Sequence, residues 1–179
     1  MDKLTLERIE LLHPSVREEV KEIYAEICER LNGRVLFRFA FTLRTFAEQD
    51  ALYAQGRTTA GAIVTKAKGG QSWHNYGLAV DIVMLHDKDG NGTFESASWD
   101  NKIDFDGDGK ADWLEAVYVF ELYGWEWGGS WRTFRDTPHF QKTFGLTIAE
   151  AKKRFETKQV ISGTTVSYTH LTLPTKRIV

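Results

Sequence analysis

Residues 78–85 (LAVDIVML) constrain the fold more than any other segment, because every position is apolar except Asp81. A short apolar run of this kind, which begins after Gly77 and ends before a polar loop, predicts a strand buried on both faces. A carboxylate inside such a strand is costly unless it is paired with a cation or bound to a metal. Asp81 therefore predicts either a metal site or an ion pair with an arginine.

Two histidines can join Asp81 at one point. His74 lies just before the strand, and a turn at Gly77 can aim both side chains at the same place. His139 follows Asp136 in the segment DTPHF and could supply a third ligand, which leaves the open position typical of catalytic zinc. Asp136 could then take a proton from the attacking water and pass it to the leaving amine. The residues alone leave zinc binding and ordinary structural roles both open.

The remaining pattern predicts an α+β domain with a small, mainly antiparallel sheet and helices packed on it. Helices are expected over residues 4–31 with a break at 13–15, and over 45–55, 113–123 and 148–155; strands are expected over 34–43, 78–85 and from 138 to 141. Ser15 and Glu18 are expected to form a capping box for the second helix. Residues 57–71 are small and polar and predict a surface loop beside a cleft. Residues 125–131 (WEWGGSW) predict a turn.

Composition limits the other possibilities. With 179 residues, 42% of them hydrophobic, the chain predicts one domain, which we place at residues 1–160. The net charge of -2 gives no argument for nucleic acid or a membrane surface as partner, no segment reads as a membrane span, and a monomer is expected. Cys28, the one cysteine, excludes an intrachain disulfide and a cysteine-based zinc site.

The two ends of the chain carry separate expectations. Residues 1–16 lack the basic start and apolar run of a signal peptide, which predicts synthesis in the cytoplasm. Residues 164–179 follow no helical or strand period and resemble the translated read-through of a sequencing adaptor. We therefore expect this tail, His170 included, to be non-native and to take no part in function.

Two motifs resemble one family of enzymes. The run SWHNYGLAVD at residues 72–81 resembles the S-x-H-x-x-G-x-A-x-D signature of the D-Ala-D-Ala carboxypeptidase/VanY family of zinc peptidases, and DTPHF at 136–140 resembles its second motif. The likeness runs in order over residues 4–155. The segments LLHPSV, TLRTFAEQDALYAQGR and EWGGSW are similar in particular to the phage-endolysin and cell-wall branch, which cleaves the L-alanyl-D-glutamate bond of peptidoglycan.

The resemblance implies a role for each matching residue. His74, Asp81 and His139 are expected to bind zinc, and Asp136 to be the catalytic acid–base. Arg44, after the first strand, is expected to stabilise the developing oxyanion. The implied fold is that of the hedgehog and D-Ala-D-Ala peptidase domains.

The resemblance also implies a substrate, which is the peptidoglycan stem peptide. Ser72 and Gln49 are expected to line its groove, although Thr42-Leu43 replaces the Gly-Tyr or Gly-Phe that the family usually shows before the arginine. The expected setting is a phage lysin or a prophage remnant that reaches the cell wall through a holin-type pore or on lysis. The alternatives are a D-Ala-D-Ala carboxypeptidase, a non-catalytic metal or cell-wall binding module, and a calcium-binding structural protein.

An acidic insertion, residues 86–115, separates the two zinc motifs. Residues 104–115 (DFDGDGKADWLE) fit the EF-hand loop, and the expected Ca²⁺ ligands are Asp104, Asp106, Asp108, the backbone carbonyl of Lys110, Asp112 and Glu115. Residues 87–98 form a weaker copy, and Asp-Gly runs also make ordinary turns. We expect Ca²⁺ to order the insertion, to help shape the substrate groove and to make activity calcium-dependent.

Overall fold

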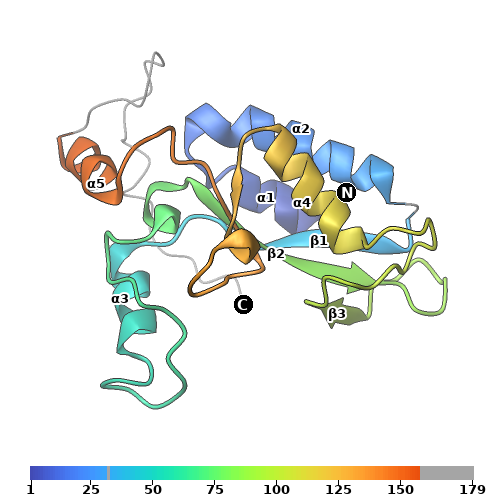
Figure 1. The fold of residues 1–179 in the computed structure, drawn as a ribbon, viewed down its shortest axis with the longest axis horizontal. Coiled ribbons are helices and arrows are strands. Elements are labelled where there is room, and N and C mark those ends of the chain that lie inside the picture. The colour runs from blue at the N-terminus through green and yellow to red at the C-terminus, as the bar shows by residue number, and fades with distance from the viewer. Residues whose placement is uncertain (32, 158–179) are drawn as a thin grey trace.

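The computed structural model describes residues 1–31 and 33–157, and the tail predicted to be non-native lies outside this part of the chain. The helices are α1 (Lys3–Ile9), α2 (Pro14–Arg30), α3 (Phe46–Ala54), α4 (Asp112–Leu122) and α5 (Ile148–Glu156), with 3₁₀ turns η1 (Trp73–Tyr76) and η2 (Gly128–Ser130). The strands are β1 (Val35–Phe41), β2 (Ala79–His86), β3 (Ser96–Ser98), β4 (Glu126–Trp127) and β5 (His139–Gln141). The predicted α+β class with an antiparallel sheet is confirmed (Figure 1).

The start of α2 differs from the prediction. Pro14 occupies the first turn, where its missing N–H costs nothing and its fixed φ suits a helix. His13 is therefore the N-cap, and its Nδ1 accepts a hydrogen bond from the Ser15 backbone N–H at 3.2 Å. The predicted capping box of Ser15 and Glu18 was wrong, because the helix begins two residues earlier than that box allows.

β2 is the centre of the sheet. β1 pairs with it along one edge, while β5 and β3 share the other edge, β5 beside the beginning of β2 and β3 beside its end. β4 pairs with β5 at the outside. Every pairing is antiparallel. β3 was not predicted, and β4 falls in the segment expected to be a turn.

One face of the sheet holds the core. Phe37 and Phe39 of β1 point toward α2 and α4, where their rings meet Trp113 at 5.5 Å and Tyr24 at 5.3 Å between centroids. Because side chains alternate along a strand, Asp81 points to the other face from its neighbour Ile82, which is fully buried. The buried strand predicted from residues 78–85 is thus confirmed, with its one carboxylate turned away from the helical core.

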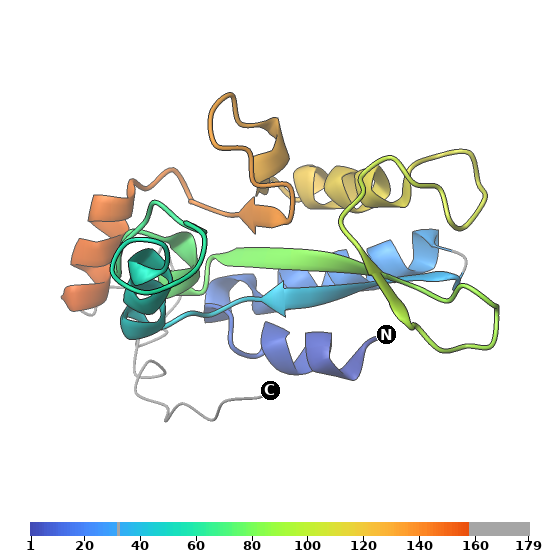
Figure 2. The same cartoon turned by 90° about the horizontal axis from the view of Figure 1, so that it is seen from below.

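The free edge of β1 is covered by α1, seen below the sheet in Figure 2. The backbone N–H of Phe39 donates to Thr5 Oγ1 at 3.1 Å, and its carbonyl accepts from Arg8 at 2.5 Å. These bonds satisfy groups that an open edge would leave free to pair with another chain.

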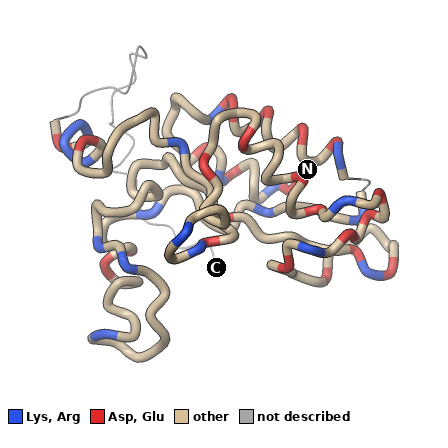
Figure 3. Tube along the Cα trace, in the orientation of Figure 1, with Lys and Arg blue, Asp and Glu red and all other residues tan. Residues whose placement is uncertain are grey.

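The two ends of β2 lie in different surroundings. α3, η1 and α5 gather near its beginning, and the acidic insertion leaves from its end (Figures 1 and 2). Figure 3 shows the acidic residues of the insertion at one side of the molecule and the basic residues of segment 57–68 at the other. Among the described residues, no helix combines the length and the apolar character needed to cross a membrane.

Candidate zinc site

The three side chains predicted as zinc ligands meet at one point. Asp81 Oδ1 lies 3.0 Å from His74 Nε2 and 3.0 Å from His139 Nδ1. The two imidazole nitrogens lie 3.2 Å apart. Ligand atoms held tetrahedrally at 2.0–2.1 Å from zinc are about 3.3 Å from one another, so the three atoms have nearly the spacing that zinc requires.

Both imidazoles direct at this point the nitrogen that carries no proton in the neutral ring. His74 Nδ1 donates to the backbone carbonyl of Thr42 at 2.7 Å, which leaves the lone pair on Nε2. His139 Nε2 donates to Gln141 Oε1 at 3.1 Å, which leaves the lone pair on Nδ1. When both rings are neutral, as metal binding requires, three acceptor atoms face one another at this point. Such a donor set fits a zinc ion.

Gln141 is in turn held by Glu126. Its amide nitrogen donates to Glu126 Oε2 at 2.9 Å, so its oxygen is the atom that faces His139. Paired strands β4 and β5 place Glu126 opposite Gln141. We did not predict either residue. The available signal was the strand period of two, which puts Gln141 on the same face as His139.

Two backbone features bring His74 to the site. An irregularity in the pairing near the end of β1 precedes Thr42, whose carbonyl holds the ring, and bulges of this kind often re-aim groups beside a functional site. Gly77 lies between η1 and β2 with a φ of 64°, and a Cβ there would meet the backbone nitrogen of His13 at 2.7 Å. Only glycine suits a turn with this conformation and this contact.

Asp81 is placed where both roles that its sequence context allowed are open to it. One carboxylate oxygen faces the two histidines, and the other lies 3.7 Å from Arg44 Nη2. Burial raises the pKa of Asp81, but the charges and hydrogen bonds of His74 and His139 outweigh burial and lower it below the ordinary value. The carboxylate therefore remains ionised and available to a cation.

Asp136 lies at the mouth of this site and is half-buried. Its backbone N–H donates to the Gly128 carbonyl, and its own carbonyl accepts from the His139 N–H, each at 3.1 Å. Burial, followed by the negative charge of Asp81, raises the pKa of Asp136 against the opposing effect of the nearby cations. A carboxylate with a raised pKa is suited to accept a proton and return it.

Arg44 and Gln49 are placed differently from each other. Arg44 lines the groove beside the triad. Gln49 was expected to contact substrate, but it is fully buried behind Arg44. Its Oε1 accepts from Arg44 at 2.9 Å, and its Nε2 donates to the carbonyl of Ala67 at 2.8 Å. Gln49 thus joins the arginine to the loop of residues 57–71, and both ends of its amide are used.

A groove of about 430 Å³ runs over the triad. Its floor holds His74, Asp81, His139, Asp136, Arg44 and the predicted substrate contact Ser72. One wall comes from the predicted surface loop, with Val64 and Lys66, and the other from residues 128–138, with Trp131 and Phe134. Lys66 Nζ lies 4.5 Å from the centre of the Phe134 ring, so the two walls touch across the groove.

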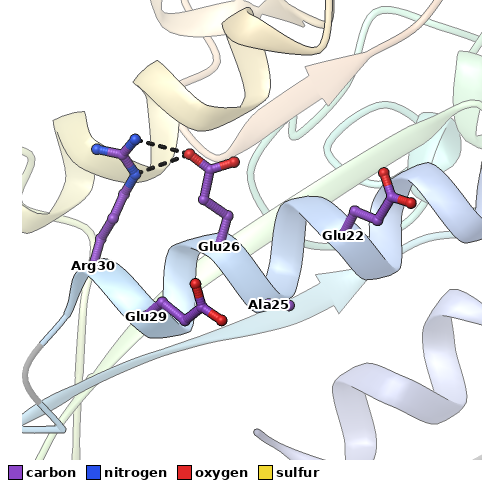
Figure 4. A pocket seen from close by; sticks show the side chains of 5 residues that line it. All are labelled: Glu22, Ala25, Glu26, Glu29 and Arg30. Atoms are coloured by element: carbon purple, nitrogen blue, oxygen red, sulfur yellow. Dashed lines mark hydrogen bonds and ion pairs between the residues drawn. The ribbon is translucent and has the colours of Figure 1, made fainter.

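A second recess lies on the outer side of α2 (Figure 4). It is lined by Glu22, Ala25, Glu26, Glu29 and Arg30. The Arg30 guanidinium donates a hydrogen bond to Glu26 Oε1 at 2.8 Å, and its central carbon lies 5.0 Å from the centre of the Tyr118 ring. The side chains of this recess come from one helix, and its one cation, Arg30, is already paired with Glu26, so it offers no comparable site.

Known proteins resemble this chain in sequence and in fold. Residues 65–142 match the sequence profile of a family described as D-alanyl-D-alanine carboxypeptidase. The chain is 44% identical over 130 residues to the peptidoglycan L-alanyl-D-glutamate endopeptidase CwlK of Bacillus subtilis (strain 168), a match that covers 73% of this chain and 72% of that protein. The crystal structure of the Serratia marcescens L-Ala D-Glu endopeptidase ChiX has the same fold, with a TM-score of 0.52 and 21% identity over 80% of this chain and 90% of that one.

The fold and the triad thus define a peptidase of the D-alanyl-D-alanine carboxypeptidase type. The chain belongs to this peptidase family, and among its members it is similar to those that act as L-alanyl-D-glutamate endopeptidases. The family resemblance drawn from the two sequence motifs is confirmed.

Proposed function

We propose that the protein is a zinc-dependent endopeptidase that hydrolyses the L-alanyl-D-glutamate bond of peptidoglycan stem peptides. The observation that carries the proposal is the convergence of three side-chain atoms that can bind zinc, from His74, Asp81 and His139, in a groove. The 44% identity to an enzyme of this specificity supports the choice of bond.

Each residue of the site has its own role in the proposed reaction. His74, Asp81 and His139 would hold the zinc ion, which supplies a Lewis acid that polarises the scissile carbonyl and acidifies the attacking water. Asp136 takes the proton of that water and delivers it to the leaving amine. Arg44 places its charge beside the carbonyl and stabilises the negative charge that develops on the oxygen.

The groove suits an anionic peptide. Arg44 and Lys66 line it, and a stem peptide carries free carboxylates that these cations can pair with. Trp131 and Phe134 offer apolar surface to the aliphatic parts of the peptide. Ser72 remains the proposed polar contact at the floor.

We assign the catalytic unit to residues 1–160, with residues 86–115 as an insertion, and we expect it to act on the cell wall as a monomer. Residues 164–179 have no role in this assignment. An origin in a phage or prophage, with release through a holin-type pore or on lysis, is part of the same proposal.

The family description favours one alternative, a D-alanyl-D-alanine carboxypeptidase. Digestion of purified peptidoglycan by the zinc-loaded protein, with mass-spectrometric identification of the new termini, decides between the two. A new L-Ala carboxyl with a D-Glu amine is the expected result, and release of free D-Ala would replace our proposal with the alternative. If no bond is cleaved while zinc is bound, the protein is a binding module.

A further inference from the structure

Two carboxylates at the start of α4 are buried without full pairing. Asp112 is 0% exposed and its Oδ1 has no hydrogen-bond partner, and Glu115 is 7% exposed with an unpartnered Oε2. A buried acceptor that is left unpaired costs free energy, and a buried charge costs more. Burial, reinforced by the neighbouring acids, raises the pKa of both groups. A bound cation would remove this cost.

The two carboxylates converge with others. Oxygen atoms of Asp106, Asp112 and Glu115 lie within 4.8 Å of one another, and Asp106 forms a second such group with Asp104 and Asp108. Oxygens at 2.3–2.6 Å from a Ca²⁺ ion are separated by up to about 5 Å, so the spacing fits one ion. A site made only of oxygen ligands favours a hard cation such as Ca²⁺ over zinc.

The neighbouring acidic loop, residues 87–98, also brings three of its acids together. Asp87 accepts backbone hydrogen bonds from Gly90, Asn91 and Gly92, so both of its oxygens are used. Asp104 in the second loop accepts turn bonds in the same way, so these bonds alone do not distinguish the two loops. Among the residues the structure describes, the buried carboxylate oxygens without a hydrogen-bond partner belong to Asp112 and Glu115, in the second loop.

Lys110 balances only part of this charge. Its ammonium lies 2.8 Å from Asp108 Oδ2 and 3.8 Å from Glu115 Oε1. The lysine side chain is 67% exposed, so water screens its charge. Its backbone carbonyl stays available as the ligand expected at this loop position.

The loop connects to the core rather than to the groove. Asp112 Oδ2 accepts from the Phe105 backbone N–H at 2.9 Å, and the Phe105 ring stacks on His86 at 3.6 Å between centroids. The next residue, Trp113, packs on Phe37 in the core. The residues that line the groove come from outside the segment 86–115. The expectation that this loop shapes the groove is therefore not met.

We propose that residues 104–115 bind one Ca²⁺ ion through Asp104, Asp106, Asp108, Asp112 and Glu115, and that this ion stabilises the junction of the insertion with α4 without acting on the hydrolytic site. The proposal does not depend on the assigned peptidase reaction. The expected consequence of calcium binding is a gain in the stability of the fold, with turnover unchanged at temperatures well below unfolding.

The test uses the full chain, zinc-loaded and freed of calcium, with CaCl₂ as the probe. Isothermal titration should give one site, and Ca²⁺ at 100 times its Kd should raise the unfolding midpoint by about 5 °C or more. Peptidoglycan hydrolysis at 25 °C should be the same with and without the ion. If 10 mM Ca²⁺ leaves the midpoint unchanged, or if hydrolysis depends on Ca²⁺, the proposal is overturned.

Two variants make the test specific. Glu115→Gln and Asp112→Asn keep the side-chain shape and remove the charge, so each should leave the calcium-free midpoint equal or higher while losing most of the shift caused by Ca²⁺. The matched control, Asp87→Asn, should keep that shift. A shift that survives in both α4 variants, or is lost in the control, contradicts the assigned ligands.

Discussion

Gln141 Oε1 lies 3.1 Å from His139 Nε2, on the face of β5 that carries the triad, and fixes which imidazole nitrogen is free to bind a metal. Replacement by Met keeps the size of the side chain and removes the acceptor. We expect Gln141→Met to lower zinc affinity roughly 10- to 100-fold, the usual effect of losing such an outer hydrogen bond. Competition with a chelator measures it. Gln71→Met, a change elsewhere in the groove, should leave zinc affinity unaltered.

The role of Asp136 is tested by a change that spares its shape. Asp136→Asn should reduce kcat by roughly 10²-fold or more, with zinc content unchanged, because proton transfer is lost while the ligands remain. A base must be deprotonated, so wild-type activity should fall on the acid side of its pH profile as Asp136 takes up a proton. Wild-type turnover in the Asn variant would exclude Asp136 as the base.

Variants of Arg44 and of Gln49 should differ in how much kcat they lose. Arg44→Met removes a charge that acts on the developing oxyanion, and kcat should fall by roughly 10²- to 10³-fold with a smaller change in KM. Gln49→Leu removes only the support of Arg44, so its loss of kcat should be smaller. If Arg44→Met lowered the stability of the protein but left kcat unchanged, Arg44 would serve only as the ion-pair partner of Asp81.

Gly128, which follows β4, packs closely against the segment that carries Asp136 and His139. A Cβ at this position would lie 2.5 Å from the carbonyl oxygen of Asp136 and 3.2 Å from His139 Cβ. Gly128→Ala should therefore displace the segment that carries both residues and lower zinc affinity and turnover together. Gly145→Ala is the matched control, because its φ of 71° brings strain but its Cβ would meet nothing within 4 Å. That variant should lose stability, by about 1 kcal/mol, and keep zinc affinity.

His13 gives the fold a dependence on pH that is separate from the zinc site. Burial, with a smaller contribution from Arg17, lowers the pKa of His13 to about 4. The unfolded chain takes up this proton near pH 6.5 and the folded chain does not, so stability is lost as the pH falls from about 6.5 to about 4. The full loss is about 3 kcal/mol. His13→Asn keeps a capping side chain, and its unfolding free energy should fall less over this range; parallel curves would contradict the assignment.

Local patterns were enough to predict part of this structure. The apolar run of β2 and the helical spacing of α2 and α4 are properties of single segments. The triad could also be foreseen, since His74 and Asp81 are separated by one turn and His139 begins a recognisable motif. Ser72, expected in the substrate groove, is among the residues that line it, as is Arg44.

Long-range pairing decided the features that were missed. β3 and β4 are short and exist because they pair with β2 and β5, a fact that their own residues do not reveal. The bond between Glu126 and Gln141 likewise depends on the register of two strands. Gln49 was read as a substrate contact, yet its burial follows from the path of a distant loop.

The two ends of β2 contact different parts of the molecule. Asp81 near its beginning belongs to the triad, whereas His86 at its end meets the insertion, and the groove draws no lining from residues 86–115. The part of the insertion that lies between β2 and α4 can therefore be shortened, exchanged or used as a graft point for a foreign module while the chemistry is left intact. An engineer who wishes to give the catalytic unit a new wall-targeting or reporter module should join it there.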